Sequence, residues 1–199
     1  MIISQGAEAI IEKKGKKIIK NRIKKSYRLD IIDIKLRKQR TKREARLLEK
    51  SSKLIPIPKV IKVDEKTHKL TLEFIPGKKL SQYLDKLKNN QEICKTIGQQ
   101  IALLHDNGII HGDLTTSNMI YFNKKVYFID FGLGYESTNA EDKAVDLHLI
   151  KQALEAKHFK NYNLYWQKIL QGYHTSDNYK VVLHRLEKVE QRGRYKQSY

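Results

Sequence analysis

The chain has 199 residues, 40% of them apolar, and a formal net charge of +18. This length suffices for one compact domain or two small lobes. Its one cysteine, Cys94, cannot form an internal disulfide, so we expect a cytoplasmic protein in which Cys94 is a small core residue. No apolar run approaches the roughly 18 residues of a membrane span, and the N-terminus lacks a secretory signal pattern, which argues against membrane and secreted classes.

The positive charge is unevenly distributed. Residues 1–70 hold 22 lysines and arginines against 8 aspartates and glutamates, a net charge of +14, whereas residues 71–199 hold 18 against 14, a net charge of +4. A basic field of this kind indicates a polyanionic partner such as nucleic acid. The alternative is a solvated lysine-rich surface, which fits the richness of the whole chain in lysine and isoleucine.

The first part of the chain is predicted to be rich in strands. A first hairpin is expected around a turn at Lys14-Gly15, with residues 9–12 as the first strand. A second pair follows a helix, and Pro76-Gly77 ends this region. The strand-like runs are residues 9–12, 17–20, 60–63 and 69–75.

A long amphipathic helix is predicted over about residues 29–50, with apolar residues at helical spacing and basic residues elsewhere. Thr41 and Glu44 have the spacing of a capping box, which predicts that the helix breaks or restarts near Thr41. Pro56 and Pro58 lie beyond its end.

The remainder is predicted to be mostly helical, with helices over about residues 79–88, 91–107, 141–157, 161–172 and 177–191. Strands followed by helices indicate an α+β class with segregated lobes. We expect one domain: a β-rich N-terminal lobe (1–75), a helical C-terminal lobe (76–190) and a basic tail (191–199), which we expect to be disordered by itself.

Two short motifs carry the chemistry. Residues 111–118 read His-Gly-Asp-Leu-Thr-Thr-Ser-Asn, and residues 130–132 read Asp-Phe-Gly. Between them lie two strand-like runs with a polar turn, which would fold Asp130 back beside Asp113 and Asn118. Oxygen ligands suit magnesium, and a carboxylate can orient an attacking oxygen, so this set predicts phosphoryl transfer.

Taken together, the motifs resemble the protein-kinase-like superfamily and, within it, the small atypical kinases of the KEOPS complex. The resemblance spans nearly the whole chain and implies a bilobal kinase-like fold with a reduced C-terminal lobe. The matching stretches are Gly6–Ala9, Ile19–Arg22, Lys25–Arg28, Leu36–Ala45, Glu73–Gly77, His111–Asn118, Asp130–Gly134, Glu141–Asp146 and Arg192–Arg194.

The resemblance implies ATP and Mg²⁺ as cofactors and assigns a role to each matching residue. Asp113 would be the catalytic carboxylate, and Asn118 and Asp130 would hold the metal. Lys20 would pair with the phosphates and Glu44 would hold Lys20 in place, with Glu12 and Glu49 as competing carboxylates. The alternative for Lys20 and Glu44 is an ordinary solvated charge.

The nucleotide would be covered and held mainly by backbone groups. No G-x-G-x-x-G is present, and Gly6 is the candidate for close approach to the phosphates. Glu73 and Ile75 would offer backbone hydrogen bonds to adenine, although the same residues also suit an edge strand before a Pro-Gly turn.

Several features depart from signalling kinases. Gly112 stands where those kinases have an arginine that reads a phosphorylated loop, and no Ala-Pro-Glu follows Asp-Phe-Gly, so we expect no activation-loop switch. The resemblance suggests that Asp146 bonds the backbone of residues 111–118, which correspond to the catalytic loop of kinases. His111 is expected to be structural. The aromatic residues at helical spacing are expected to be core residues: Tyr162, Tyr165, Trp166 and Tyr173.

The function implied is that of a serine/threonine protein kinase or ATPase within KEOPS, which supports threonylcarbamoyl-adenosine modification of tRNA. Its partners would be the threonylcarbamoyl-transferase subunit, which its tail would contact, a small accessory subunit, and tRNA through the basic N-terminal lobe, with no membrane. The alternatives are a free small kinase of the ribosome-maturation or small-molecule type, and a non-catalytic tRNA or protein scaffold.

Overall fold

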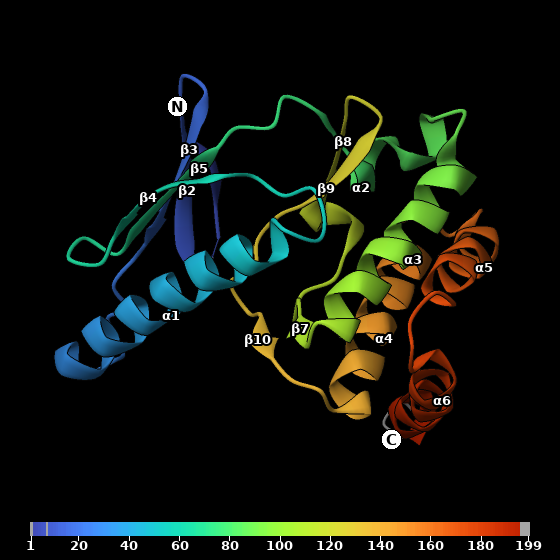
Figure 1. Cartoon of the computed structure of the whole chain (residues 1–199). Coiled ribbons are helices and arrows are strands. Elements are labelled where there is room, and N and C mark those ends of the chain that lie inside the picture. Colours follow the sequence, from blue (N-terminus) through green and yellow to red (C-terminus); the bar gives the residue numbers. More distant parts are fainter. Residues whose placement is uncertain (1, 7, 196–199) are drawn as a thin grey trace.

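A computed structural model describes residues 2–6 and 8–195 (Figure 1). The N-terminal part is a five-stranded antiparallel sheet in the order β1-β2-β3-β5-β4. Its strands are β1 (Ile2–Gln5), β2 (Ala9–Lys14), β3 (Lys17–Arg22), β4 (Val60–Asp64) and β5 (Lys69–Glu73). Both predicted hairpins are confirmed. The expectation that residues 9–12 form the first strand is wrong, because β1 precedes them and pairs with β2 along the sheet edge.

Helix α1 (Asp30–Ser51) is continuous, so the predicted break near Thr41 is wrong. The Thr41 hydroxyl donates to the Arg37 carbonyl at 2.8 Å, one turn back, and therefore does not cap a new helix. Glu44 instead points toward the sheet and bonds to Lys20 and Arg22. The ion pairs of Glu44 with the sheet residues Lys20 and Arg22 thus replace the capping contact that the local sequence predicts.

The C-terminal part is built around helices (Figure 1). The predicted helix over residues 79–88 is shorter than expected, because β6 (Lys78–Lys79) starts the segment and the rest divides into α2 and a 3-10 turn. The elements are α2 (Leu80–Tyr83), η1 (Leu84–Lys86), α3 (Asn90–Asp106), β7 (Ile109–Ile110), η2 (Thr116–Asn118), β8 (Met119–Phe122), β9 (Lys125–Phe128), β10 (Tyr135–Glu136), α4 (Ala140–Lys157), α5 (Tyr162–Tyr173) and α6 (Tyr179–Tyr195).

Helix α6 extends past the predicted end of the last helix. Residues 191–195 are helical, and the Arg192 guanidinium donates to Glu141 of α4 at 2.5 Å. The expectation that the tail is disordered from residue 191 is therefore wrong for 191–195, because this segment continues the helix. Residues 196–199 lie outside the described residues.

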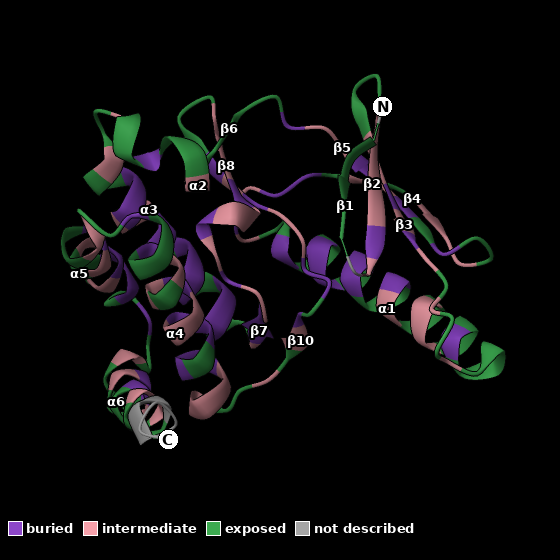
Figure 2. Cartoon of the chain, turned by 180° about the vertical axis from the view of Figure 1, so that it is seen from behind, coloured by how far each residue is buried: buried purple, intermediate pink, exposed green. Residues whose placement is uncertain are grey.

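The core joins both parts of the chain. Buried residues gather on the inward faces of α3 and α4 and beneath the sheet (Figure 2). Cys94 is buried there, as predicted, and burial raises the pKa of its thiol to about 12. Tyr165 and Tyr173 are fully buried and Tyr162 and Trp166 pack against this core, which confirms the core interpretation of the aromatic residues. Among residues 2–6 and 8–195, no helix is both long and apolar enough to traverse a lipid bilayer.

Candidate active site

The strand–turn–strand segment brings the two predicted motifs together. Strands β8 and β9 pair through a turn in which Asn123 and Lys124 have positive φ angles of 47° and 60°. This is the turn geometry that matches the twist of a tight hairpin. The Ile129 amide then donates to the Asn118 carbonyl at 2.9 Å, which fixes Asp130 next to the catalytic loop.

Asp113 and Asn118 are joined directly. The Asn118 side-chain amide donates to the Asp113 carboxylate at 2.8 Å and to the Asp113 carbonyl at 2.9 Å. Asp130 has a φ of +64°, a sparsely populated conformation for a residue other than glycine. Such backbone strain persists only where the surroundings hold it, and it clusters at functional sites.

A cluster of four charges links the sheet, α1 and Asp130. The Lys20 ammonium lies 2.7 Å from Glu44 and 2.6 Å from Asp130. The Arg22 guanidinium bonds the second oxygen of Glu44 at 2.5 Å. The predicted contact between Glu44 and Lys20 is therefore present, and two cations balance two carboxylates, of which Glu44 is buried and Asp130 has a side chain that is 38% exposed.

The charge pairing outweighs the cost of burial. Burial disfavours the ammonium form of Lys20, but the Glu44 and Asp130 carboxylates together hold the pKa of Lys20 above its ordinary value. Burial likewise disfavours the ionised form of Asp130, whereas Lys20 and the Gly132 amide hold the pKa of Asp130 below its ordinary value. Both groups are charged at neutral pH.

Asp146 fixes the first turn of the catalytic loop, as predicted. Its carboxylate accepts from the His111 amide at 2.7 Å and from the Gly112 amide at 2.9 Å. His111 packs against the Phe131 ring, with the ring centroids 4.5 Å apart, and its Nε2 lies 3.1 Å from the Ile129 carbonyl. These contacts agree with a structural role for His111.

A cavity of about 340 Å³ lies between the sheet and the catalytic loop, and Lys20, Glu73, Ile75, Asn118 and Asp130 all line it. Ile75 is buried, and its carbonyl accepts from the Gly77 amide at 2.9 Å, so its proposed contact with adenine stays a prediction. Glu73 ends β5, where its amide donates to the Lys59 carbonyl at 2.9 Å and its carboxylate accepts from the Lys59 amide at 3.3 Å. The Glu73 amide is therefore already used, so a contact of this residue with adenine would have to come from its carbonyl.

Gly6 has a different placement from the other candidates. Its amide donates to the Ala9 carbonyl at 3.0 Å in the turn between β1 and β2. Of the described residues in this region, Ile3 and Ser4 line the cavity and Gly6 does not. A role for Gly6 in covering the phosphates stays a prediction and would require this turn to close further.

The residues present fit a nucleotide with a magnesium ion. The Asn118 amide nitrogen is committed to Asp113, which leaves its oxygen as a possible ligand. One Asp130 oxygen bonds Lys20 and Gly132, and the other has no partner among the described residues. Two oxygen donors beside a lysine are a donor set that suits magnesium and phosphate.

Comparisons with known proteins agree with this geometry. The RIO domain family model matches residues 12–147. The KEOPS complex subunit Bud32 of Pyrococcus abyssi is 42% identical over 212 aligned residues, which cover 98% of this chain and 96% of that protein. The chain belongs to the RIO domain family and, within it, to the Bud32 family of KEOPS complex subunits.

Two further matches define the context of this family. A probable bifunctional tRNA threonylcarbamoyladenosine biosynthesis protein of Methanococcus vannielii is 40% identical over 98% of this chain, which spans only 36% of that protein. The crystal structure of a Rio2 kinase–ADP/Mg²⁺–phosphoaspartate complex from Chaetomium thermophilum is 15% identical and has a TM-score of 0.62, with 97% of this chain and 70% of that chain covered. This likeness confirms the bilobal α+β kinase-like fold.

Three residues of the site within this RIO domain were not assigned a role from the sequence. Arg22 bonds Glu44, Lys79 lines the cavity, and Pro58 lines it from the opposite lobe. Arg22 could have been found, because residues two apart on a strand share a face and Lys20 is on the same strand. No sequence pattern marks Lys79 as a site residue, because its position depends on the pairing of β6 with β8.

The backbone at Gly112 leaves no room for a side chain, so the arginine that signalling kinases have at this position would not fit. Its φ is +78°, and a Cβ atom there would lie 2.5 Å from the Leu133 carbonyl oxygen. We expect Gly112→Ala to lower the free energy of unfolding about 1–3 kcal/mol more than Gly15→Ala. Gly15 also has a positive φ, of 58°, but nothing lies within 4 Å of its Cβ position. Denaturant titration of both variants measures the difference, and equal losses would show that the clash with Leu133 is relieved freely.

Proposed function

We propose that this protein is an ATP-dependent phosphotransferase of the KEOPS complex that regulates the threonylcarbamoyl-transferase subunit during tRNA modification. Its RIO domain and kinase-like fold support phosphoryl transfer in general. The finer assignment, serine/threonine protein kinase activity or ATP hydrolysis, is our inference. The observation that carries it is the meeting of Lys20, Asn118 and Asp130 at one cavity, with Asp113 hydrogen-bonded to Asn118.

Each of these side chains has a distinct task in the proposal. Asp113, oriented by Asn118, would accept the proton of the attacking hydroxyl or water. Lys20, positioned by Glu44, would pair with phosphate oxygens. Asn118 and Asp130 would hold the magnesium ion, which supplies charge neutralisation on the phosphates when bound. A non-catalytic scaffold would need none of this arrangement, which is why we favour the enzyme.

The partner assignment rests on the relatives. The Methanococcus vannielii protein joins a segment like this chain to a longer remainder, and its name places it in threonylcarbamoyladenosine biosynthesis. We propose that this chain performs the same task beside a separate transferase subunit, together with a small accessory subunit. We also propose a single domain with the lobe boundary at residues 75–76, a contact from the basic tail to the transferase, and a cytoplasmic location.

Reconstitution tests this function. Purified transferase subunit, tRNA, bicarbonate, threonine and ATP should yield threonylcarbamoyl-adenosine, measured by nucleoside mass spectrometry, at a rate that rises when this protein is added. The Asp113→Asn variant should still bind the transferase but should not give the full stimulation. Full stimulation by that variant would favour the scaffold, and absence of binding to the transferase would favour a free kinase.

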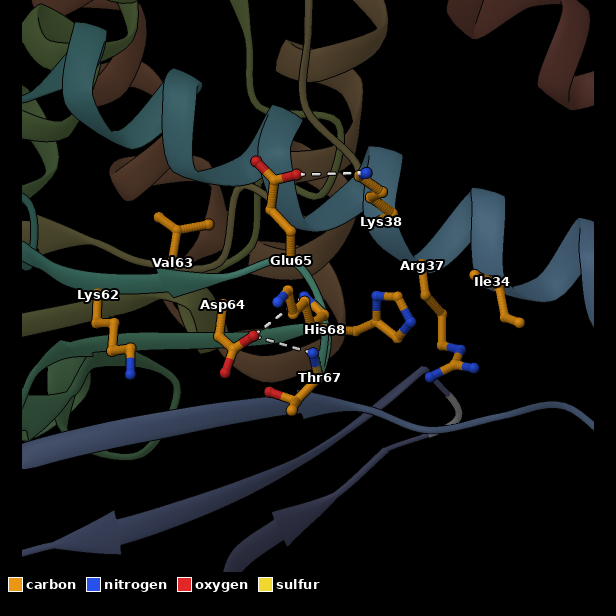
Figure 3. A pocket seen from close by; sticks show the side chains of 10 residues that line it. Ile34, Arg37, Lys38, Lys62, Val63, Asp64, Glu65, Thr67 and His68 are labelled. Carbon is orange, nitrogen blue, oxygen red and sulfur yellow. Dashed lines mark hydrogen bonds and ion pairs between the residues drawn. The ribbon is translucent and has the colours of Figure 1, made fainter.

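The basic N-terminal lobe offers a specific surface for tRNA. A groove of about 990 Å³ lies between α1 and the β4–β5 turn (Figure 3). On α1, Lys38 and Lys42 form ion pairs with Glu65, and Arg40 forms one with Glu8. Lys62 and Lys66 line the same groove and, among the described residues, make no ion pair. These two lysines are therefore the cations most available to a phosphate backbone.

We expect tRNA binding to weaken steeply between 50 and 200 mM salt, because each neutralised phosphate releases counterions. Lys62→Glu with Lys66→Glu should weaken binding and flatten this dependence. The matched control is Lys124→Glu with Lys125→Glu, an equal change of charge on the β8–β9 turn of the other lobe, which is exposed. Filter binding of the KEOPS assembly over this salt range measures both. An unchanged slope in the first variant, or equal losses in the two, would leave only the solvated-surface interpretation.

A further inference from the structure

A chain of hydrogen bonds joins Thr116 of the catalytic loop to His158 and Asp85, and none of these three residues lines the cavity. The Thr116 hydroxyl lies 3.2 Å from Nε2 of His158, and Nδ1 of His158 lies 2.5 Å from a carboxylate oxygen of Asp85. The side chains of Thr116 and His158 are almost completely buried. The three residues belong to η2, the C-terminal end of α4 and η1, so the chain connects segments distant in sequence.

The direction of each bond follows from the chemistry of the groups. Burial favours the protonated form of Asp85, but His158, Asn161 and Tyr165 together hold the pKa of Asp85 below its ordinary value, so it is ionised at neutral pH. An ionised carboxylate only accepts, so Nδ1 of His158 carries the proton. In the tautomer with its single proton on Nδ1, Nε2 is an acceptor, and the Thr116 hydroxyl donates to it.

Asp85 is itself fixed from the other side. Its second oxygen accepts from the Tyr165 hydroxyl and from the Asn161 amide, each at 3.0 Å. Both donors lie at the start of α5. The carboxylate therefore has three partners, and the imidazole it orients has little freedom to rotate.

The order hydroxyl–imidazole–carboxylate is that of a hydrolase triad, but this chain cannot act as one. The Thr116 hydroxyl is inaccessible, so no substrate reaches it. The hydrogen-bonded chain instead acts on the conformation of the catalytic loop. Thr116 begins η2, which ends at Asn118, and the Asn118 backbone amide donates to the Thr115 carbonyl at 3.0 Å. The orientation of this turn decides whether the Asn118 side chain meets Asp113 at 2.8 Å.

We propose that Asp85, His158 and Thr116 are positioning residues that hold the catalytic loop in the geometry required for phosphoryl transfer. The proposal rests on the proposed function, because it assigns these residues to the same site. In this proposal, the three residues contact neither the nucleotide nor the phosphoryl acceptor. They act through the η2 turn on Asn118 and Asp113, and so they should affect the rate of the chemical step more than the binding of ATP.

Thr116→Val tests this, because it replaces the hydroxyl by a methyl group of similar size. We expect kcat for ATP turnover to fall about 10- to 100-fold, as displacing a reacting group by about 1 Å costs up to 100-fold, with KM for ATP within about twofold of wild type. Thr116→Ser keeps the hydroxyl and should recover most of the rate. Asp85→Asn, at a partly exposed residue, gives a second variant that should fold.

The control is Ser176→Ala. Ser176 is also buried in the C-terminal lobe and its hydroxyl donates to Asp106 at 2.7 Å, far in sequence from the loop. It should lose comparable stability with unchanged kcat. A readout independent of activity is hydrogen exchange, which should rise over residues 111–118 in Thr116→Val and Asp85→Asn but not in Ser176→Ala. Unchanged exchange and kcat in the first two variants would overturn the proposal. An inactive wild type with the expected exchange pattern would instead overturn the proposed function alone.

Discussion

Replacement of Asp130 by alanine is expected to reduce magnesium-dependent ATP turnover at least about 100-fold. That is the scale of losing one electrostatic group aimed at developing charge. The substitution removes an oxygen that lines the cavity and leaves Lys20 with Glu44 as its carboxylate partner. Release of labelled phosphate from γ-labelled ATP measures the effect.

The backbone at Asp130 calls for a second variant. Its φ of +64° suits asparagine better than alanine, so Asp130→Ala combines loss of the carboxylate with added strain. Asp130→Asn keeps the shape and removes only the charge. Both variants should lose turnover, and Asp130→Asn should retain more of the wild-type melting temperature. Turnover near wild type in Asp130→Asn would exclude a charged metal ligand at this position.

Asp113→Asn is expected to separate chemistry from binding. The amide at position 113 retains one oxygen that can accept from Asn118, so the loop should keep its conformation. Removal of a general base lowers the rate by about 10² to 10⁴-fold, whereas ATP affinity should stay within a few-fold because Asp113 lies outside the residues that line the cavity. Isothermal calorimetry and single-turnover phosphate release measure the two quantities.

The outcomes of the Asp113→Asn experiment are distinct. Loss of nucleotide binding would show that Asp113 supports the fold of the site and does not act as the base. Normal transfer with normal binding would assign the base to another group. His111 is a poor candidate, since its Nε2 is directed at the Ile129 carbonyl and its ring packs on Phe131.

Local patterns in the sequence sufficed for much of the fold and the site. Alternating apolar residues and polar turns gave the hairpins, and the spacing of Asp113, Asn118 and Asp130 gave the site because β8 and β9 form a tight hairpin between them. Lys20 and Glu44 were paired by resemblance, and their 2.7 Å contact agrees. Such features depend on neighbours in the chain or on a motif with a fixed geometry.

The missed features depend on contacts between distant segments. Strand β1 has four residues, all exposed, and it exists only because β2 offers it an edge. Thr41 and Glu44 have a capping pattern, yet Lys20 and Arg22 bind Glu44 from the sheet. The contact between His158 and Thr116 joins residues 42 apart. No local periodicity encodes contacts of this kind.

The continuity of α1 makes it a lever. Its 22 residues are about 33 Å long, and Glu44 lies about 21 Å from Asp30, the exposed residue at its start. Since no break at Thr41 absorbs a displacement, a tilt of about 5° about that end would carry Glu44 about 2 Å. That distance would separate the Glu44 carboxylate from the Lys20 ammonium, so the tilt of the whole helix decides whether this ion pair forms.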